Sequence, residues 1–435
     1  MSSDPFRSEH RLNRACYLAA VGVVVAWSLV YHCFSFGPLA DEDWHVEVAR
    51  YYGHGGSGWL AGLMTLPGYH LFVNALSGGD PDLLTARLAS TLFAMVALGA
   101  FAAARRHLHP TAPGPATLLL ALLPILLPFT GMAYNDVTAL ALLLCAWWMQ
   151  LSERFLFSAT FLALACVVRQ TSIVWALFFF GWEVLQALPA GGETSLPWWR
   201  KTLAALPRAS RRAGWHLAAV AGCAAIMLWA GRLMPSHHDP GHWQRPNLAT
   251  LHFGALLLLA LGLPAWLRYG PAAARSLATV ARARPARFVF LASVIALAVA
   301  LLAVTYENPH LHNRIHYGRS GILRYAYLRN WPLVWIDAHF WLRVASGAVV
   351  VGMSLALAWL FRVQAHTRAL TLATGCGAVL LGSNFLVEPR YYIPPAVMLL
   401  SLLEIDRRTL GWLAAWFAML NVTYAPFILE GYSLW

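Results

Sequence analysis

Long apolar runs alternate with short polar segments along the whole chain. Several of these runs are shorter than the ~20 residues that a perpendicular membrane span needs, and we expect those to be broken or partly re-entrant helices. The pattern predicts an all-α, polytopic membrane protein with about 11–13 spans. The expected spans lie near residues 15–36, 83–103, 116–133, 137–151, 155–168, 171–187, 215–233, 250–267, 288–305, 343–361, 370–386, 391–404 and 408–427.

Composition supports this class. Of the 435 residues, 59% are hydrophobic and only 11% are charged. The net charge of +12 could indicate nucleic acid, but the arginines lie in short segments such as 200–212 and 268–287, as the positive-inside rule predicts. Arg7, Arg11 and Arg14 precede the first run, so we expect a cytoplasmic amino terminus. The six cysteines form no CxxC pair, and no segment resembles a soluble domain, so we predict one integral domain over residues 1–435.

The first outer segment, residues 37–82, contains PLADEDWHVEVARYY and indicates an interfacial helix that returns to the membrane. Asp41, Glu42 and Asp43 are adjacent, and a carboxylate at the membrane edge is a candidate general base. The alternative is a solvated acidic cap, because Asp and Glu are favoured at helix amino termini. The sequence leaves the two interpretations even.

Three further polar sites interrupt apolar runs on the same predicted side. Asp136 follows Tyr134 and Asn135 in a turn, which by itself favours a helix cap. Arg169 and Gln170 interrupt CVVRQTSIVW, and a charge at that depth is rarely without a role. Near the carboxyl end, FLVEPRYYIPP contains Glu388 and Arg390, for which a structural ion pair is the alternative.

The longest outer segment, residues 306–342, is rich in arginine and histidine. Arginine forks and histidines near a membrane surface suit a phosphate group. A metal site is the alternative, but the histidine spacing in a loop broken by Pro and Asn does not specify one. The residues concerned are Arg314, Arg319, Arg324, Arg329, His310, His312 and His316.

In order and spacing, several motifs resemble the dolichyl-phosphate-glucose alpha-1,2-glucosyltransferases. They cover most of the chain, and RQTSIVW is the most specific of them. Two departures are a shifted histidine–asparagine pattern in 308–317 and Pro389 in place of a bulkier residue. The motifs are DE-x-WH followed by W-x(4)-MTLPG, RLASTLF at 87–93, the Tyr134–Asp136 turn, RQTSIVW at 169–175, NLATLHF at 247–253, NPHLHNRIHY at 308–317 and LVEPRYYI at 386–393.

The resemblance implies a membrane fold of the GT-C type and inverting transfer of a hexose from a polyprenyl-phosphate sugar, with an outer-face site. It implies a carboxylate base, for which we expect Asp41, with Glu42 close behind, and no cofactor. The expected partners are the lipid-linked donor, a glycan or lipid-linked oligosaccharide acceptor and membrane lipids, without nucleic acid. The residues expected to hold the donor phosphate are Arg169, Arg314, His316 and Arg390. Those expected to bind substrate are His45, Asp136, Gln170, His252, Asn313, Tyr317 and Glu388.

Two alternatives stay open. A transporter of lipid-linked sugars also lines its path with membrane charges, but it would favour inverted repeats, which the sequence lacks. Another GT-C transferase would use a different lipid-linked sugar on a cell-envelope glycan. The arginine-rich, nearly lysine-free composition suggests a prokaryotic source. The membrane would then be the plasma membrane, and otherwise that of the endoplasmic reticulum.

Overall fold

The computed structural model describes residues 5–35, 37–39, 41–56, 66–188, 197–229, 248–307, 331–382 and 387–429, and these segments contain helices and no strand. The prediction of an all-α protein is confirmed. The helices are α1 Pro5–Phe34, α2 Glu42–Gly53, α3 Gly68–Leu76, α4 Leu83–Leu108, α5 Pro113–Ala121, η1 Leu127–Thr130, α6 Asn135–Leu151, α7 Phe155–Val168, η2 Gln170–Ile173, α8 Val174–Ala187, α9 Trp198–Trp229, α10 Ala249–Leu261, α11 Leu263–Ala283, α12 Pro285–Val304, α13 Trp331–Ala338, α14 Phe340–Arg362, α15 Thr367–Gly382, η6 Pro389–Tyr392, α16 Ile393–Leu402 and α17 Arg407–Leu429.

Five of the described helices, α1, α4, α12, α14 and α17, are long and apolar enough to cross a membrane. A sixth span is possible from α10 and α11, which meet at a bend of 93°. Shorter apolar helices fill the bundle between them, including α7 and α15. The chain is therefore a multi-pass membrane protein in which several apolar runs are broken, as their lengths predicted.

Three expected segments differ from the structure. The apolar run 116–133 is not one helix, because α5 ends at Ala121 and only the single turn η1 follows. Pro124 and Pro128 lie in this run, and a proline removes a backbone donor and collides with the preceding turn. The predicted inner loop 268–287 is also largely helical, since α11 continues to Ala283. The predicted inner loop 200–212 is helical as well, because it lies within α9.

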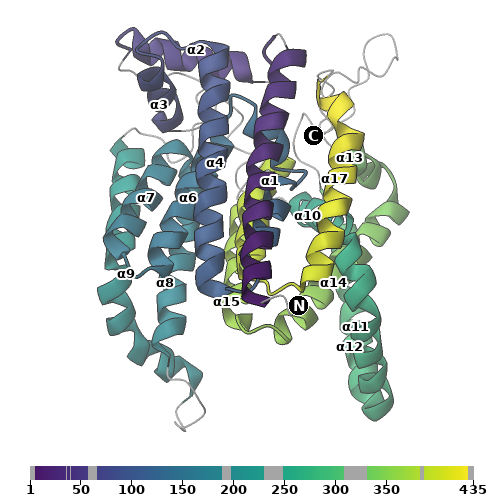
Figure 1. The fold of residues 1–435 in the computed structure, drawn as a ribbon. Coiled ribbons are helices and arrows are strands. Elements are labelled where there is room, and N and C mark those ends of the chain that lie inside the picture. The colour runs from purple at the N-terminus through teal and green to yellow at the C-terminus, as the bar shows by residue number, and fades with distance from the viewer. Residues whose placement is uncertain are drawn as a thin grey trace.

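Figure 1 shows α2 lying across one end of the bundle, close to α3 and to the carboxyl-terminal end of α1. Gly68, the first residue of α3, allows this helix to approach α7, because an added Cβ would lie 2.8 Å from the carbonyl oxygen of Val167. That contact brings α3 next to Arg169, which directly follows α7. The arrangement therefore places the first outer segment beside RQTSIVW.

The opposite end of the bundle is held by a buried arginine. Arg105, in the last turn of α4, donates hydrogen bonds to the carbonyl oxygens of Leu400, Ser401 and Leu403 at 3.3, 3.1 and 2.7 Å. These carbonyls close α16, where a helix lacks internal donors and favours a cation. By fixing α16, this contact also fixes the position of η6, which immediately precedes it.

Candidate active site

Glu42 is the centre of a saturated hydrogen-bond network that we call the Glu42 cluster. Its side chain has no exposed surface. Arg87 donates from Nε at 3.0 Å and from Nη2 at 2.7 Å, and Tyr31 donates its hydroxyl at 3.2 Å. The backbone N–H groups of Leu39 and Ala133 donate at 2.9 and 2.7 Å. Both carboxylate oxygens are fully occupied, so this group ties together the ends of α1, α2, α4 and α6.

Asp41, one residue earlier, has a different environment. Its side chain is 42% exposed, and one carboxylate oxygen lies 4.0 Å from Nη2 of Arg390. Its backbone N–H donates to the hydroxyl of Tyr134 at 2.9 Å, which holds the residue in place without engaging the carboxylate. A carboxylate positioned through its backbone and open to solvent is free to take a proton from a substrate.

Asp41 borders a second group of charges, the Arg390 cluster, defined as Asp41, Asp136, Arg169, Glu388 and Arg390. Asp136 forms an ion pair with Arg169, and its other oxygen lies 4.0 Å from Nη1 of Arg390. Arg390 also pairs through Nε with Glu388 at 2.5 Å. The structure therefore brings together five of the residues selected from sequence, although they come from four separate parts of the chain.

Local backbone breaks bring these side chains to one place. Tyr134, Arg169 and Glu388 are each extended, with φ between −129° and −147°, and each directly precedes a helical turn. The starts of α6, η2 and η6 consequently meet at the same end of the bundle. Because free N–H groups at helix starts favour anions, this geometry suits a phosphate as well as the observed carboxylates.

Two tyrosines pack against the arginines. The guanidinium of Arg169 lies 5.0 Å from the ring centre of Tyr391, and that of Arg390 lies 5.5 Å from the same ring. Arg390 also lies 5.2 Å from the ring of Tyr134. Aromatic faces attract cations and restrict their orientation. The two guanidinium groups are thus held in fixed positions, and that of Arg390 lies beside Asp41.

His45, on α2, contacts Tyr134, whose ring packs against Arg390. Its Nδ1 lies 2.9 Å from Nε2 of His70, and its ring meets the edge of Tyr134 at 5.1 Å between centroids. Burial, together with His70 and the nearby arginines, lowers the pKa of His45 well below its usual range. Burial lowers the pKa of His70 to about 3. Both rings are therefore neutral at physiological pH, when one nitrogen of each can donate and the other accept.

The remaining predicted residues are less closely placed. Gln170 opens η2 and is half-buried next to Arg169. His252 lies on α10, where its Nδ1 is 2.8 Å from Oγ of Ser346 and its ring is 4.8 Å from that of Tyr306. α10 is linked to the site because Tyr392 donates to the carbonyl of Thr250 at 2.6 Å. Four residues lie outside the described part of the chain: Asn313, Arg314, His316 and Tyr317.

Sequence reasoning missed the site residues that support others: Arg87, His70, Tyr134 and Tyr391. Arg87 begins RLASTLF, so a lone arginine at the head of an apolar run was an available signal. Tyr134 and Tyr391 lie within the quoted motifs beside Asp136 and Arg390, but their packing on arginines depends on the fold. His70 carried no signal, because it is one histidine in a short amphipathic segment.

A metal centre was the alternative for the outer histidines. Among the residues that the structure describes, no group of three or more His, Cys, Asp or Glu side chains is placed to hold a metal ion. The histidines of 306–342 named above lie between residues 308 and 330, outside those segments.

Fold and site together define an all-helical, multi-pass membrane protein with a carboxylate–arginine site at one end of its bundle. The chain matches the DIE2/ALG10 family over residues 36–401, which is most of its length. It belongs to that family, as the motif resemblance predicted.

One curated relative is the Dol-P-Glc:Glc(2)Man(9)GlcNAc(2)-PP-Dol alpha-1,2-glucosyltransferase of Arabidopsis thaliana, 28% identical over 177 residues. The match covers 36% of this chain and 35% of the relative, so it spans about a third of that protein.

Among solved structures, ArnT from Cupriavidus metallidurans bound to undecaprenyl phosphate is 15% identical, with a TM-score of 0.40, covering 94% of this chain and 79% of that one. The Archaeoglobus fulgidus oligosaccharyltransferase is 12% identical, with a TM-score of 0.31, covering 95% and 57%. Similarity at this level does not transfer residue roles.

Proposed function

We propose that this protein is an inverting, GT-C-type glycosyltransferase that moves a hexose, with glucose as the first candidate, from a polyprenyl-phosphate donor. The acceptor is a glycan or a lipid-linked oligosaccharide. Family membership supports the reaction class. The observation that carries the proposal is an accessible carboxylate, Asp41, placed 4.0 Å from the half-buried Arg390 at the end of a membrane bundle. A base at this position reaches both a lipid-held donor and a water-side acceptor.

The proposed reaction is a single displacement. Asp41 takes the proton of the acceptor hydroxyl while that oxygen attacks the anomeric carbon. The bond between this carbon and the phosphate oxygen breaks, and the polyprenyl phosphate leaves with the electron pair. Arg169 and Arg390 stabilise the charge that grows on the leaving phosphate, because preorganised donors act strongly in a site shielded from water. Attack from the face opposite the leaving group inverts the configuration.

Asp41, rather than Glu42, is the proposed base. Five donors already occupy the Glu42 carboxylate. Taking up a proton would break a charge-assisted pair with Arg87 inside the protein, which is costly. The Asp41 carboxylate is exposed and has one cation at 4.0 Å. The choice between these adjacent residues therefore rests on burial and saturation.

Charge balance defines what else the donor phosphate requires. The Arg390 cluster holds three carboxylates and only two arginines, so an added phosphate needs further positive charge. Arg314 and His316 are the proposed sources, because they lie in the basic segment 306–342. Arginines can balance a single phosphate without a cation, so we expect activity in the presence of a chelator. Loss of turnover on chelation would refute this expectation.

The other residues are assigned supporting roles. Asp136 and Glu388 orient the arginines through the ion pairs described above. The residues proposed to contact the sugar or the acceptor are His45, Gln170, His252, Asn313 and Tyr317. We place the site on the outer or lumenal face and the amino terminus in the cytoplasm. The membrane is the plasma membrane of a prokaryote or the endoplasmic reticulum of a eukaryote.

The test is transfer of radiolabelled glucose from synthetic polyprenyl-phosphate glucose by the purified protein, beside the same lipid carrying mannose. We expect glucose transfer with an inverted anomeric centre. Transfer from mannose alone would keep the reaction class and change the sugar. Folded protein that neither transfers the sugar nor hydrolyses the donor, but moves the intact donor across the membrane of liposomes, would refute this proposal. That result would identify the protein as a transporter.

A further inference from the structure

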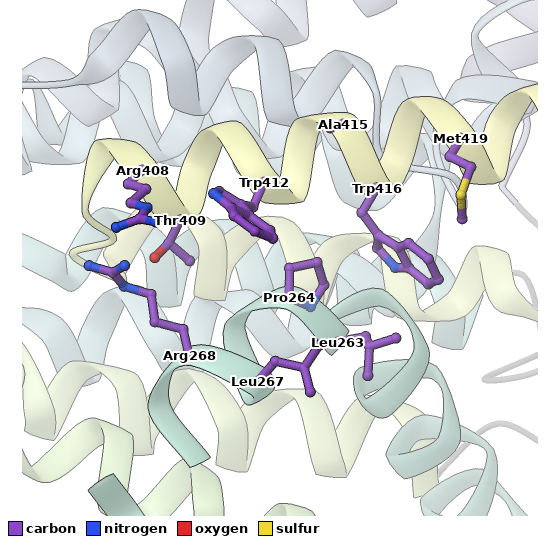
Figure 2. Close-up of a pocket in the computed structure, with 10 residues that line it drawn as sticks. All are labelled: Leu263, Pro264, Leu267, Arg268, Arg408, Thr409, Trp412, Ala415, Trp416 and Met419. Carbon is purple, nitrogen blue, oxygen red and sulfur yellow. The ribbon is translucent and has the colours of Figure 1, made fainter. Parts of the chain in front are cut away.

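A second cavity lies away from the Arg390 cluster. It has a volume of about 600 Å³ and runs between α17 and the junction of α10 with α11 (Figure 2). Most of its lining is apolar, and two arginines and a threonine close one end. The lining residues used below are Leu263, Pro264 and Leu267 on one wall and Trp412, Ala415, Trp416 and Met419 on the other.

Hydrogen bonds fix the walls of this groove. Trp416 of α17 donates its indole N–H to the carbonyl of Ala260 at 2.8 Å. Trp266 of α11 donates to the carbonyl of Leu258 at 2.9 Å. Both carbonyls belong to the last turn of α10, and that of Ala260 has no helical donor, because residue 264 is a proline without an N–H. The groove is therefore part of the packed structure and not a gap between loose helices.

The closed end of the groove carries excess positive charge. Figure 2 shows the guanidinium groups of Arg268 and Arg408 at the same end, beside Thr409. Arg268 is paired with Asp406 at 3.2 Å. Arg408 is exposed and forms no ion pair with any residue in the described segments. Two like charges directed toward one place, with one counter-charge, favour an anion between them.

The groove has the length of one membrane leaflet. From Arg408 to Met419 there are eleven residue-to-residue steps of helix, which at 1.5 Å each span about 16 Å, half of a ~30 Å hydrocarbon core. The charged end lies at the start of α17, next to the start of α1, because Arg407 pairs with Glu9 at 2.6 Å. This is the end of the bundle opposite Asp41, which follows the carboxyl-terminal end of α1.

We propose that this groove binds a glycerophospholipid with an anionic headgroup, taken from the leaflet opposite the Arg390 cluster. Its phosphate contacts Arg408 and Arg268, and an acyl chain lies against Trp412 and Trp416. Charge complementarity selects an anion. A leaflet-length groove matches an acyl chain, whereas a polyprenyl tail extends well beyond it. This lipid is bound between α17 and the bent helix pair, and the site does not depend on the proposed transferase activity.

The test is native mass spectrometry of the purified full-length protein after exchange into phosphatidylglycerol or phosphatidylcholine with identical acyl chains. One arginine near a membrane surface favours an anionic lipid by about fivefold, so we expect phosphatidylglycerol to be retained about fivefold more. Arg408→Gln should abolish this preference. Arg275→Gln is the matched control, because it removes an equal charge from exposed α11 outside the groove.

A second variant separates the groove from its charge. Ala415→Trp fills the groove without changing any charge, and we expect this variant to lose bound phosphatidylglycerol. Arg408→Gln should keep the thermal stability of the unmodified protein, which shows that its loss of lipid preference is not a loss of folding. Equal retention of both phospholipids by the unmodified protein would overturn the proposal. An equal loss in Arg275→Gln and Arg408→Gln would overturn it too. Tighter binding of polyprenyl phosphate, lost in Arg408→Gln, would assign the groove to that lipid instead.

Discussion

The Glu42 cluster and the Arg390 cluster are built from the same residue types at the same end of the bundle, yet they differ in how completely their carboxylates are paired. In the first, one carboxylate meets one arginine and every acceptor position is filled. In the second, three carboxylates share two arginines, and Arg390 lies 4.0 Å from both Asp41 and Asp136. A saturated ion pair stabilises structure, whereas an incompletely matched cluster has capacity left for binding and proton transfer.

The sharpest test of this difference is Asp41→Asn. General base catalysis contributes about 10²–10⁴-fold to a rate, so we expect kcat for glucose transfer to fall by that factor. Folding should be unaffected, since the side chain makes no structural hydrogen bond that the structure describes. Single-turnover transfer and a thermal unfolding curve measure the two quantities. The neighbouring exposed carboxylate gives the control, and Asp43→Asn should retain full activity.

Arg390→Gln tests the open cluster from its cationic side. Removing one preorganised donor to a developing charge costs about 10²–10³ in kcat. We expect that loss together with weaker donor binding, because Asp41, Asp136 and Glu388 would then face a single arginine. Initial rates over a range of donor concentrations separate kcat from KM. Unchanged rates would remove Arg390 from the site.

Glu42→Gln should produce the opposite outcome to Asp41→Asn. Breaking a buried ion pair from one side costs about 3–5 kcal/mol, so we predict a large loss of stability. Molecules that remain folded should still transfer glucose at near-normal rates per folded protein. Chemical denaturation gives the free energy of unfolding, and active-site titration gives the folded fraction. A fully stable but inactive variant would instead identify Glu42 as the base.

The buried histidine pair, His45 and His70, makes the stability of this end of the bundle depend on pH. The pKa of His70 is about 3 in the folded protein and about 6.5 when unfolded. The unfolded state therefore binds more protons below pH 6.5. The contribution of the neutral His70 to the free energy of unfolding is fully present above that pH and is lost as the pH drops. For this residue the expected slope is about 1.4 kcal/mol per pH unit. Unfolding at pH 7, 6 and 5 measures it; His70→Gln should reduce the slope, and the exposed His54→Gln should not.

Tyr134→Phe is expected to have the smallest effect. It keeps the ring beneath Arg390 and removes only the hydroxyl that accepts the N–H of Asp41. One hydrogen bond contributes about 1 kcal/mol, so kcat should fall about fivefold. KM for the donor should stay constant, because the arginines are untouched. A rise in KM with constant kcat would indicate that the Tyr134 hydroxyl binds the donor and does not position Asp41.

Much of the fold was predictable because the membrane imposes simple rules on the chain. Apolar run lengths and arginine-rich segments such as 200–212 indicated a helical multi-pass protein. The breaks at Arg169 and Glu388 were also readable, because charges interrupted apolar runs there. The continuation of α11 through 268–283 was not, since a basic amphipathic helix and a basic loop have similar compositions.

The sequence by itself determined the family, the membrane class and the charged residues of the Arg390 cluster, because these follow from composition and motif order. It favoured Asp41 only slightly over Glu42, since adjacent carboxylates have the same chemistry. Only the tertiary structure separated them. Arg87 and two backbone amides reach Glu42 from distant segments, and Arg390 approaches Asp41 across more than three hundred residues of chain. Saturation and exposure are properties of the packed structure, and they decide which carboxylate is available for chemistry.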